Sequence, residues 1–368
     1  MEVNYSLSES RNVTALPMID VFPIRSWILL CYCVISLTGI VGNTFVILVI
    51  SRHETMGATS FRIYVGALAV ADLLVTLFCI PIYITSTSNF HYHLTGMSGK
   101  IMCKLLSGYM LPFHLAGMSI YIMVAISIQR YFAICRPLSS MANPSPSKAK
   151  MVVFGIWVWS IILAVYPVMG LEYADEGQAT VGAHCKFSAV FNNEILPKTM
   201  YVLTTSVQFI IPFVIMIFCF FQIKVNIIKQ IKQIKLQDAS SQSLEMKRVR
   251  LRKQTVTTVL IVIVSFIILL TPSQFLYFCF NFSLYQTSWN SNLYQSTVVL
   301  YFVTSCINPV IYAFRSKPFR NGLKETFEKC FGKLRDRSQS GMSLTISSVI
   351  HPGNGSPVSE RSRANTGM

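Results

Sequence analysis

The sequence predicts an all-α membrane protein, a seven-transmembrane helix bundle followed by a short amphipathic eighth helix. Its 368 residues are 52% hydrophobic and only 12% charged, whereas soluble domains carry about a quarter charged residues. Seven apolar stretches each approach the ~20 residues that cross a bilayer. Because backbone polar groups cannot remain unpaired in hydrocarbon, these stretches must be helices. In chain order they are Trp27–Ser51, Ile63–Thr85, Ile101–Ile134, Val152–Leu171, Met200–Ile223, Val256–Phe282 and Leu293–Phe314.

The basic residues between these stretches predict how the bundle, residues 27–314, is oriented. Lysine and arginine gather after the third and fifth stretches and directly beyond the seventh. Cytoplasmic loops carry such an excess, so we expect these segments in the cytoplasm and the tail of residues 1–26 outside the cell. The formal net charge of +16 therefore suits a membrane surface, and nucleic acid is not expected as a partner.

The outer side carries two kinds of predicted covalent modification. Asn4 and Asn12 begin Asn-X-Ser/Thr sequons in the outer tail and are predicted glycosylation sites. Cys103, at the outer end of the third stretch, and Cys185, in the second outer loop, both face the oxidising compartment. We predict a disulfide between them, which would hold the outer loop across the mouth of the bundle.

Asp72 is the one carboxylate well inside any of the seven stretches. Since an isolated charge is costly in a membrane, such a residue is a candidate functional site. Asn43, Ser119 and Asn308 supply neutral oxygens and amides at comparable depths. These groups could hold a small hard cation such as sodium, with Asp72 as the metal ligand; the alternative is a hydrogen-bonded network around a protonated Asp72. We favour the sodium site, and no other cofactor is expected.

Five short motifs occur in chain order, each on a different predicted helix: "GNTFVILVI", "LAVADLL", "QRYFAICRPL", "FIILLTP" and "NPVIY". Over roughly Trp27 to Cys330 the chain thereby resembles the rhodopsin-like (class A) G-protein-coupled receptors, with no subfamily indicated. The resemblance implies a multi-pass plasma-membrane receptor, not an enzyme. Such a receptor binds an extracellular ligand and activates heterotrimeric G proteins when its sixth helix moves outward. The resemblance also implies an allosteric sodium site at the four polar residues named above.

The resemblance further implies a cytoplasmic switch for G-protein activation. Its residues would be Gln129, Arg130, Tyr131, Leu138 and Tyr312. Arg130 would be exposed by the motion of the sixth helix and would contact the carboxy-terminal helix of a Gα subunit. Leu138 would pack into the G protein from the inner loop.

The chain departs from the family pattern within this switch. Gln129 replaces the acid that usually precedes the arginine, and Arg252 stands where many members carry a second acid on the sixth helix. Charge-assisted hydrogen bonds are roughly twice as strong as neutral ones, so Gln129 should restrain Arg130 less than a carboxylate would. Arg252 would repel Arg130, and we therefore expect raised basal signalling. The other departures are Phe220 for a tyrosine, Leu270 for a tryptophan, and a spacing from Cys103 to Arg130 that is two residues longer than usual.

The segment of residues 315–331 predicts an amphipathic helix along the inner leaflet of the membrane. Phe319, Leu323 and Phe327 recur every four residues and form one apolar stripe. Cys330 at its end is a predicted palmitoylation site, which would add a lipid anchor. The tail of residues 332–368 contains many Ser, Gly and Pro residues and is predicted to be disordered. Its phosphorylated serines and threonines would recruit arrestin; an ordinary polar tail is the alternative.

The outer half of the bundle is mostly neutral and aromatic, which bears on the ligand. The third stretch contains no acid to bind an amine, and Phe302 lies near the depth of the retinal-binding lysine, so aminergic receptors and opsins are disfavoured. The predicted pocket residues are Tyr109, Phe113, Phe187, Gln208, Gln274, Tyr277 and Tyr294. We favour a neuropeptide-like ligand; a lipid mediator or a melatonin-like small molecule is the alternative. A scavenger receptor that does not couple to G proteins is the rival class, because the switch residues are altered.

Overall fold

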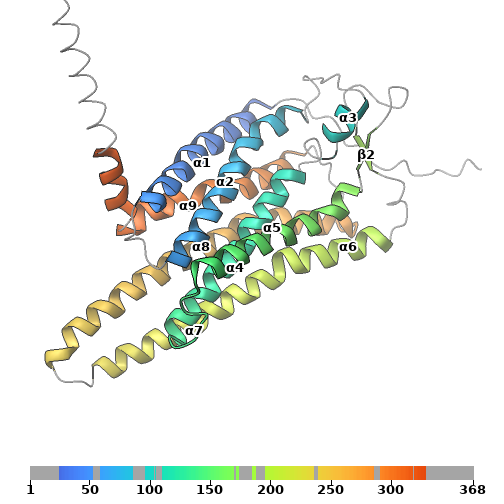
Figure 1. The fold of residues 1–368 in the computed structure, drawn as a ribbon. Coiled ribbons are helices and arrows are strands. Elements are labelled where there is room, and N and C mark those ends of the chain that lie inside the picture. Colours follow the sequence, from blue (N-terminus) through green and yellow to red (C-terminus); the bar gives the residue numbers. More distant parts are fainter. Residues whose placement is uncertain are drawn as a thin grey trace, which may run out of the picture. The chain divides into compact units, whose positions relative to one another are not determined.

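The computed structural model describes residues 25–52, 59–85, 96–102, 104, 110–169, 171–173, 185–187, 195–235, 239–285, 291–317 and 319–328. The chain divides into two compact units, Met1–Gly322 and Leu323–Met368. The first unit contains a bundle of long helices (Figure 1). Of the second unit the structure describes residues 323–328, which are helical.

Seven helical segments of the described chain are long and apolar enough to cross a membrane, which confirms the predicted fold class. They are α1 (Ser26–Arg52), α2 (Thr59–Thr85), α4 (Met110–Cys135), α5 (Pro146–Met169), the continuous run of α6 (Ile195–Thr205), η4 (Ser206–Ile210) and α7 (Ile211–Ile234), then α8 (Ala239–Asn281) and α9 (Asn292–Arg315). One further helical segment covers residues 319–328 and includes part of the predicted amphipathic helix. Within it Phe319 is buried and Phe327 is 38% exposed.

Two small elements lie outside the seven spans. Helix α3 (Gly96–Met102) precedes α4, and strands β1 (Leu171–Tyr173) and β2 (Cys185–Phe187) form an antiparallel pair in which Leu171 faces Phe187. Ile101, the predicted start of the third stretch, lies in α3, and the described part of α4 starts at Met110. Residues 103 and 105–109 lie outside the described residues, so the predicted start of this stretch stays a prediction.

Helices α7 and α8 extend together away from the other helices at one end of the bundle (Figure 1). The candidate spanning part of α8 is Val256–Phe280, whereas the helix itself begins at Ala239. Buried apolar side chains continue along the extension, including Ile227 and Ile234 of α7 and Val249 of α8. Burying these side chains between the two helices stabilises the extension. The predicted cytoplasmic loop is therefore largely helical.

The first helix packs closely against two neighbours through its glycines. A Cβ atom placed on Gly39 would lie 2.2 Å from Cγ2 of Thr76 in α2. A Cβ atom placed on Gly42 would lie 2.7 Å from Cβ of Pro309 in α9. Small residues allow such close approach of helix backbones in membranes, where dispersion contacts replace the hydrophobic effect as the driving force. The glycines thus bring Asn43, the next residue along α1, close to α9.

Pro212 alters the backbone hydrogen bonding of the α6–α7 run. In η4 the turn widens, and the N–H of Ile211 donates to the carbonyl of Ser206, five residues earlier. The next donor would be Pro212, which has no N–H, so the carbonyl of Val207 is left for another partner. The Tyr121 hydroxyl of α4 donates to that carbonyl at 2.9 Å. The altered turn thereby links α4 to the α6–α7 run.

Candidate functional site

A polar cluster lies buried inside the bundle around Asp72 of α2, which is fully buried. Its Oδ1 accepts a hydrogen bond from the Ser119 hydroxyl of α4 at 2.8 Å. Its Oδ2 accepts one from Nδ2 of Asn308 in α9, also at 2.8 Å. Three helices are thus joined through one carboxylate. The structure brings together three of the four residues in the predicted sodium site.

Asn43 of α1, the fourth predicted residue, joins the cluster indirectly. Its Nδ2 donates to the backbone carbonyls of Gly39 and Ser305, each at 2.9 Å. The carbonyl of Ser305 is available because its helical partner would be the missing N–H of Pro309. Asn43 therefore replaces a backbone hydrogen bond that the proline removes, and it connects α1 to α9 beside Asp72.

Ser305 is a member of the cluster that the sequence analysis missed. It is 1% exposed and lies three residues before Asn308, so the two side chains share one face of α9. That spacing was the signal in the sequence. Its hydroxyl adds a further oxygen close to the Asp72 site.

The donor atoms of this cluster fit a small hard cation. Such cations take oxygen ligands from carboxylates, amides and hydroxyls. Asp72 supplies a carboxylate, and Oδ1 of Asn308 is buried without a hydrogen-bond partner. An unpaired buried oxygen is costly, and a cation would satisfy it. The part of the chain that the structure describes holds no group of three or more His, Cys, Asp or Glu side chains that could hold a metal ion.

Of the predicted switch residues, Gln129 and Arg130 lie in the last turns of α4 and contact the start of α2. The guanidinium carbon of Arg130 lies 3.6 Å from the ring centroid of Phe61. Among the described residues Arg130 forms no ion pair, and its Nε atom is buried without a hydrogen bond. Gln129 is buried and donates from Nε2 to the Ser60 hydroxyl. Phe61 and Ser60 were not predicted; their position at the start of α2 gave no signal in the sequence.

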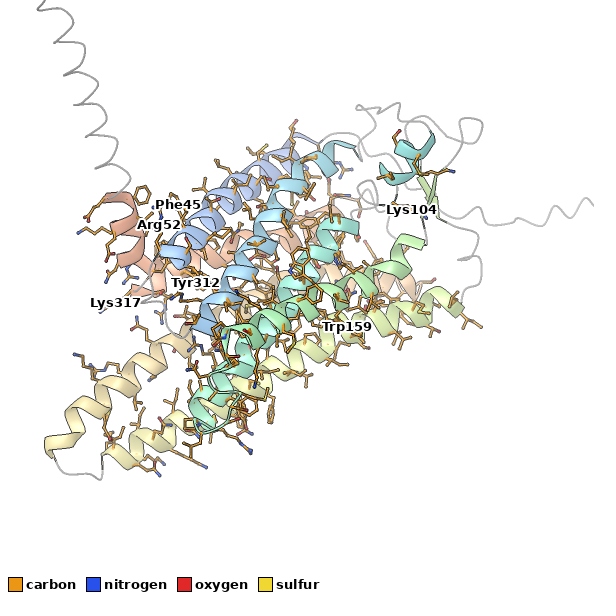
Figure 2. All side chains as sticks on the ribbon, in the orientation of Figure 1. Phe45, Arg52, Lys104, Trp159, Tyr312 and Lys317 are labelled. Atoms are coloured by element: carbon orange, nitrogen blue, oxygen red, sulfur yellow. The ribbon has the colours of Figure 1, made fainter. Side chains whose placement is uncertain are left out.

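The other switch residues have separate surroundings. Tyr131 packs against the apolar cluster between α7 and α8 and stacks edge-on with Phe132. Leu138 is fully exposed in the turn after α4. Tyr312 lies at the same end of the bundle as Arg52 (Figure 2). The centroid of its ring is 6.2 Å from that of the Phe319 ring. No hydrogen bond joins Tyr312 to Arg130 in the part of the chain described.

Three described residues of the predicted ligand pocket, Phe113, Gln274 and Tyr277, lie in two aromatic groups. The ring of Phe113 packs edge-on against Tyr301, with 4.8 Å between the ring centroids. Its centroid lies 5.4 Å from that of Phe302, which is completely buried. Tyr277 packs edge-on against Tyr201, with 5.0 Å between the ring centroids. The Tyr201 hydroxyl donates to the backbone carbonyl of Gln274. Tyr301 and Tyr201 were not among the predicted residues.

The remaining two predicted pocket residues within the described part occupy special places in their helices. Gln208 is half-buried within η4. Tyr294 lies in the first turn of α9, where its backbone N–H donates to the capping hydroxyl of Ser291. The capping bond fixes the start of α9.

Several predicted residues lie outside the part of the chain that the structure describes. They are Asn4, Asn12, Cys103, Tyr109 and Cys330, together with the side chains of Cys185, Phe187 and Arg252. The disulfide, the glycosylation and palmitoylation sites and the repulsion by Arg252 therefore stay predictions. The seven cysteines described as free all lie in the long helices, as expected for packing residues.

The chain is similar to known receptors over most of its length. The family model described as "7 transmembrane receptor (rhodopsin family)" matches residues 42–312. Somatostatin receptor type 1 of Rattus norvegicus is 27% identical over 295 residues, covering 80% of this chain and 69% of that protein. Galanin receptor type 1 of Rattus norvegicus is 28% identical over 307 residues, with 82% of each chain covered. The crystal structure of squid rhodopsin is similar with a TM-score of 0.67 at 19% identity, covering 85% of this chain and 91% of that chain.

Proposed function

The chain belongs to the rhodopsin family of seven-transmembrane receptors, and we propose that it is a peptide-activated receptor that signals through heterotrimeric G proteins. The observation that carries this proposal is the similarity over about four fifths of the chain to proteins named as somatostatin and galanin receptors, whose ligands are peptides. The family consists of receptors and not enzymes, and its members are multi-pass proteins of the plasma membrane.

Three features of the chain support a G protein as the partner. Arg130 lies at the inner end of α4, and the exposed Leu138 follows in the next turn. The extension of α7 and α8 carries many lysines and arginines, which an acidic protein surface would attract. In the proposed mechanism, ligand binding at the outer end moves α8 outward, and Arg130 then reaches the carboxy-terminal helix of Gα. The amino terminus would lie outside the cell, and a phosphorylated tail would recruit arrestin.

The cluster around Asp72 would hold sodium as an allosteric ion. Asp72 would supply the negative charge, and Ser119, Ser305 and Asn308 would supply neutral oxygens. The bound ion would balance the buried carboxylate, which is otherwise a costly isolated charge in the bundle. Because Asp72 is bonded to both α4 and α9, a change in ion occupancy would alter the contacts among three helices.

A scavenger receptor without G-protein coupling is the second candidate function. It is favoured by one observation: neither Gln129 nor Arg130 is paired with an acid in the part of the chain that the structure describes. A lipid mediator or a melatonin-like small molecule is the alternative to a peptide ligand.

The deciding experiment combines a ligand screen with nucleotide exchange on purified G proteins. The receptor in lipid nanodiscs is exposed separately to a peptide library, a lipid library and an indole-amine library. We expect a peptide to accelerate GTP-analogue binding by at least one Gα class. If only the lipid library or only the indole-amine library accelerates GTP-analogue binding, the proposal of a peptide ligand is refuted. Saturable ligand binding without exchange on any Gα class would favour the scavenger.

A further inference from the structure

Two neighbouring residues at the start of α2 hold two neighbouring residues at the end of α4. Ser60 accepts a hydrogen bond from Gln129, and Phe61 lies under the guanidinium of Arg130. We infer that Ser60 and Phe61, here called the α2 clamp, keep Arg130 withdrawn from the cytoplasmic face, in place of an acidic partner. This inference rests on the proposed function, because the withdrawn arginine is the residue proposed to contact Gα.

The contact between Arg130 and Phe61 has the geometry of a strong cation–π interaction. The 3.6 Å distance from Cζ to the ring centroid is well inside the ~6 Å limit for this interaction. Arginine suits it because its planar, weakly hydrated guanidinium stacks on aromatic faces. The Nε atom of Arg130 is buried without a hydrogen bond, so the ring is the neighbour that offers the cation electron density there. The Phe61 ring thus stabilises the Arg130 cation in this position, in place of an acidic side chain.

The second half of the α2 clamp explains why position 129 is a neutral amide. Gln129 donates to Ser60 from a buried position, which fixes the last turns of α4 against the first turn of α2. This bond sets Arg130 over the next residue of α2, Phe61. A carboxylate at position 129 could only accept from the Ser60 hydroxyl, and it would offer Arg130 a charged partner on its own helix. Gln129 is therefore a positioning residue for the stacked arginine.

The strength of the clamp sets the basal activity of the receptor. Cation–π contacts shift a two-state equilibrium by about two- to thirtyfold, depending on how far the cation is desolvated. Removing the ring should raise the population with Arg130 released by a factor in that range. The missing acids predicted weak restraint of Arg130; the α2 clamp supplies a restraint that does not need them.

The test compares ring-removing and ring-retaining variants of the full-length receptor in lipid nanodiscs. Phe61→Leu and Phe61→Met remove the ring while retaining apolar bulk, and Phe61→Tyr retains the aromatic face. Phe314→Leu is the matched control, since Phe314 is 78% exposed at the inner end of α9. Ser60→Ala removes the hydrogen bond from Gln129 alone.

The first measurement is the NMR signal of the Arg130 Nε–H group in 15N-arginine-labelled receptor, assigned with Arg130→Lys. We expect a ring-current shift in wild type, Phe61→Tyr and Phe314→Leu, and an ordinary arginine position in Phe61→Leu and Phe61→Met. An unshifted Arg130 signal in wild type would overturn the inference, as would a shift that persists without the ring. This measurement needs no G protein.

The second measurement is ligand-free nucleotide exchange, together with spin-label distances between the inner ends of α4 and α8. We expect Phe61→Leu to raise exchange about two- to thirtyfold and Ser60→Ala to raise it less, with Phe61→Tyr and Phe314→Leu near wild type. Equal exchange and equal distance populations in wild type and Phe61→Leu would overturn the inference. If no variant promotes exchange, the proposed function fails, while the NMR signal and the distances still decide whether the clamp exists.

Discussion

Replacing Asp72 by asparagine tests whether the buried cluster is a sodium site. The carboxylate accepts hydrogen bonds from Ser119 and Asn308, each at 2.8 Å. An asparagine has the same shape but accepts at only one of its two terminal atoms, so residue 72 can no longer accept hydrogen bonds at both positions. Losing a hydrogen bond to a charged group costs about 1.5–3 kcal/mol in any salt. The variant also loses the negative charge that would attract the ion.

The effect of sodium on the unfolding midpoint of the receptor decides whether the cluster binds the ion. An ion that binds only the folded receptor stabilises it by about 2.7 kcal/mol when its concentration is 100 times its Kd. We expect the unfolding midpoint of wild type to rise with sodium chloride relative to choline chloride at equal ionic strength, and that of Asp72→Asn not to rise. The assay follows a thiol-reactive dye, because Cys79, Cys219 and Cys279 are free and buried until the protein unfolds.

Two serines of α4 provide a matched control for this assay. Ser119 and Ser127 are both buried, and each hydroxyl donates to the carbonyl four residues earlier. Only Ser119 also donates to Asp72. We therefore expect Ser119→Ala to weaken the sodium response and Ser127→Ala to leave it at the wild-type value. A wild-type sodium response in Asp72→Asn, or none in wild type, would refute the assignment.

Three further predictions concern packing and coupling. Gly39→Ala should destabilise the receptor by about 1–3 kcal/mol, because its Cβ would overlap Thr76; an unchanged unfolding midpoint would contradict this packing. Asn43→Ala should cost about 1–3 kcal/mol in the same assay, since it leaves the Ser305 carbonyl buried without its donor. Leu138→Asp should lower ligand-stimulated nucleotide exchange at unchanged thermal stability, because Leu138 is fully exposed; full exchange by this variant would remove Leu138 from the G-protein interface.

The spans were predictable from the sequence because membranes impose a simple requirement on composition and length. The requirement says nothing about helix beyond an apolar stretch, and α8 extends back to Ala239 although its apolar stretch starts at Val256. The strand pair Leu171–Tyr173 and Cys185–Phe187 was also missed. Its pairing joins segments separated in the chain, and neither segment is long enough to show a periodic pattern.

The candidate site was predictable where a rare residue type marks it. Asp72 stands out because a carboxylate is costly in a membrane, and Asn308 stands out as a polar residue of the NPVIY motif at a comparable depth. Ser305 and Phe61 could not be found in this way, since serine and phenylalanine are ordinary in transmembrane helices. Their roles come from neighbours on other helices, Asn43 for the first and Arg130 for the second.

The most direct test of the central claim is nucleotide exchange by purified wild type and Arg130→Ala, each with and without an activating peptide from the screen. We expect the peptide to accelerate exchange in wild type, and Arg130→Ala to bind the peptide but promote little exchange. Equal peptide-stimulated exchange by the two proteins would contradict the role of Arg130. Peptide binding without exchange in wild type would contradict the assignment as a G-protein-activating receptor.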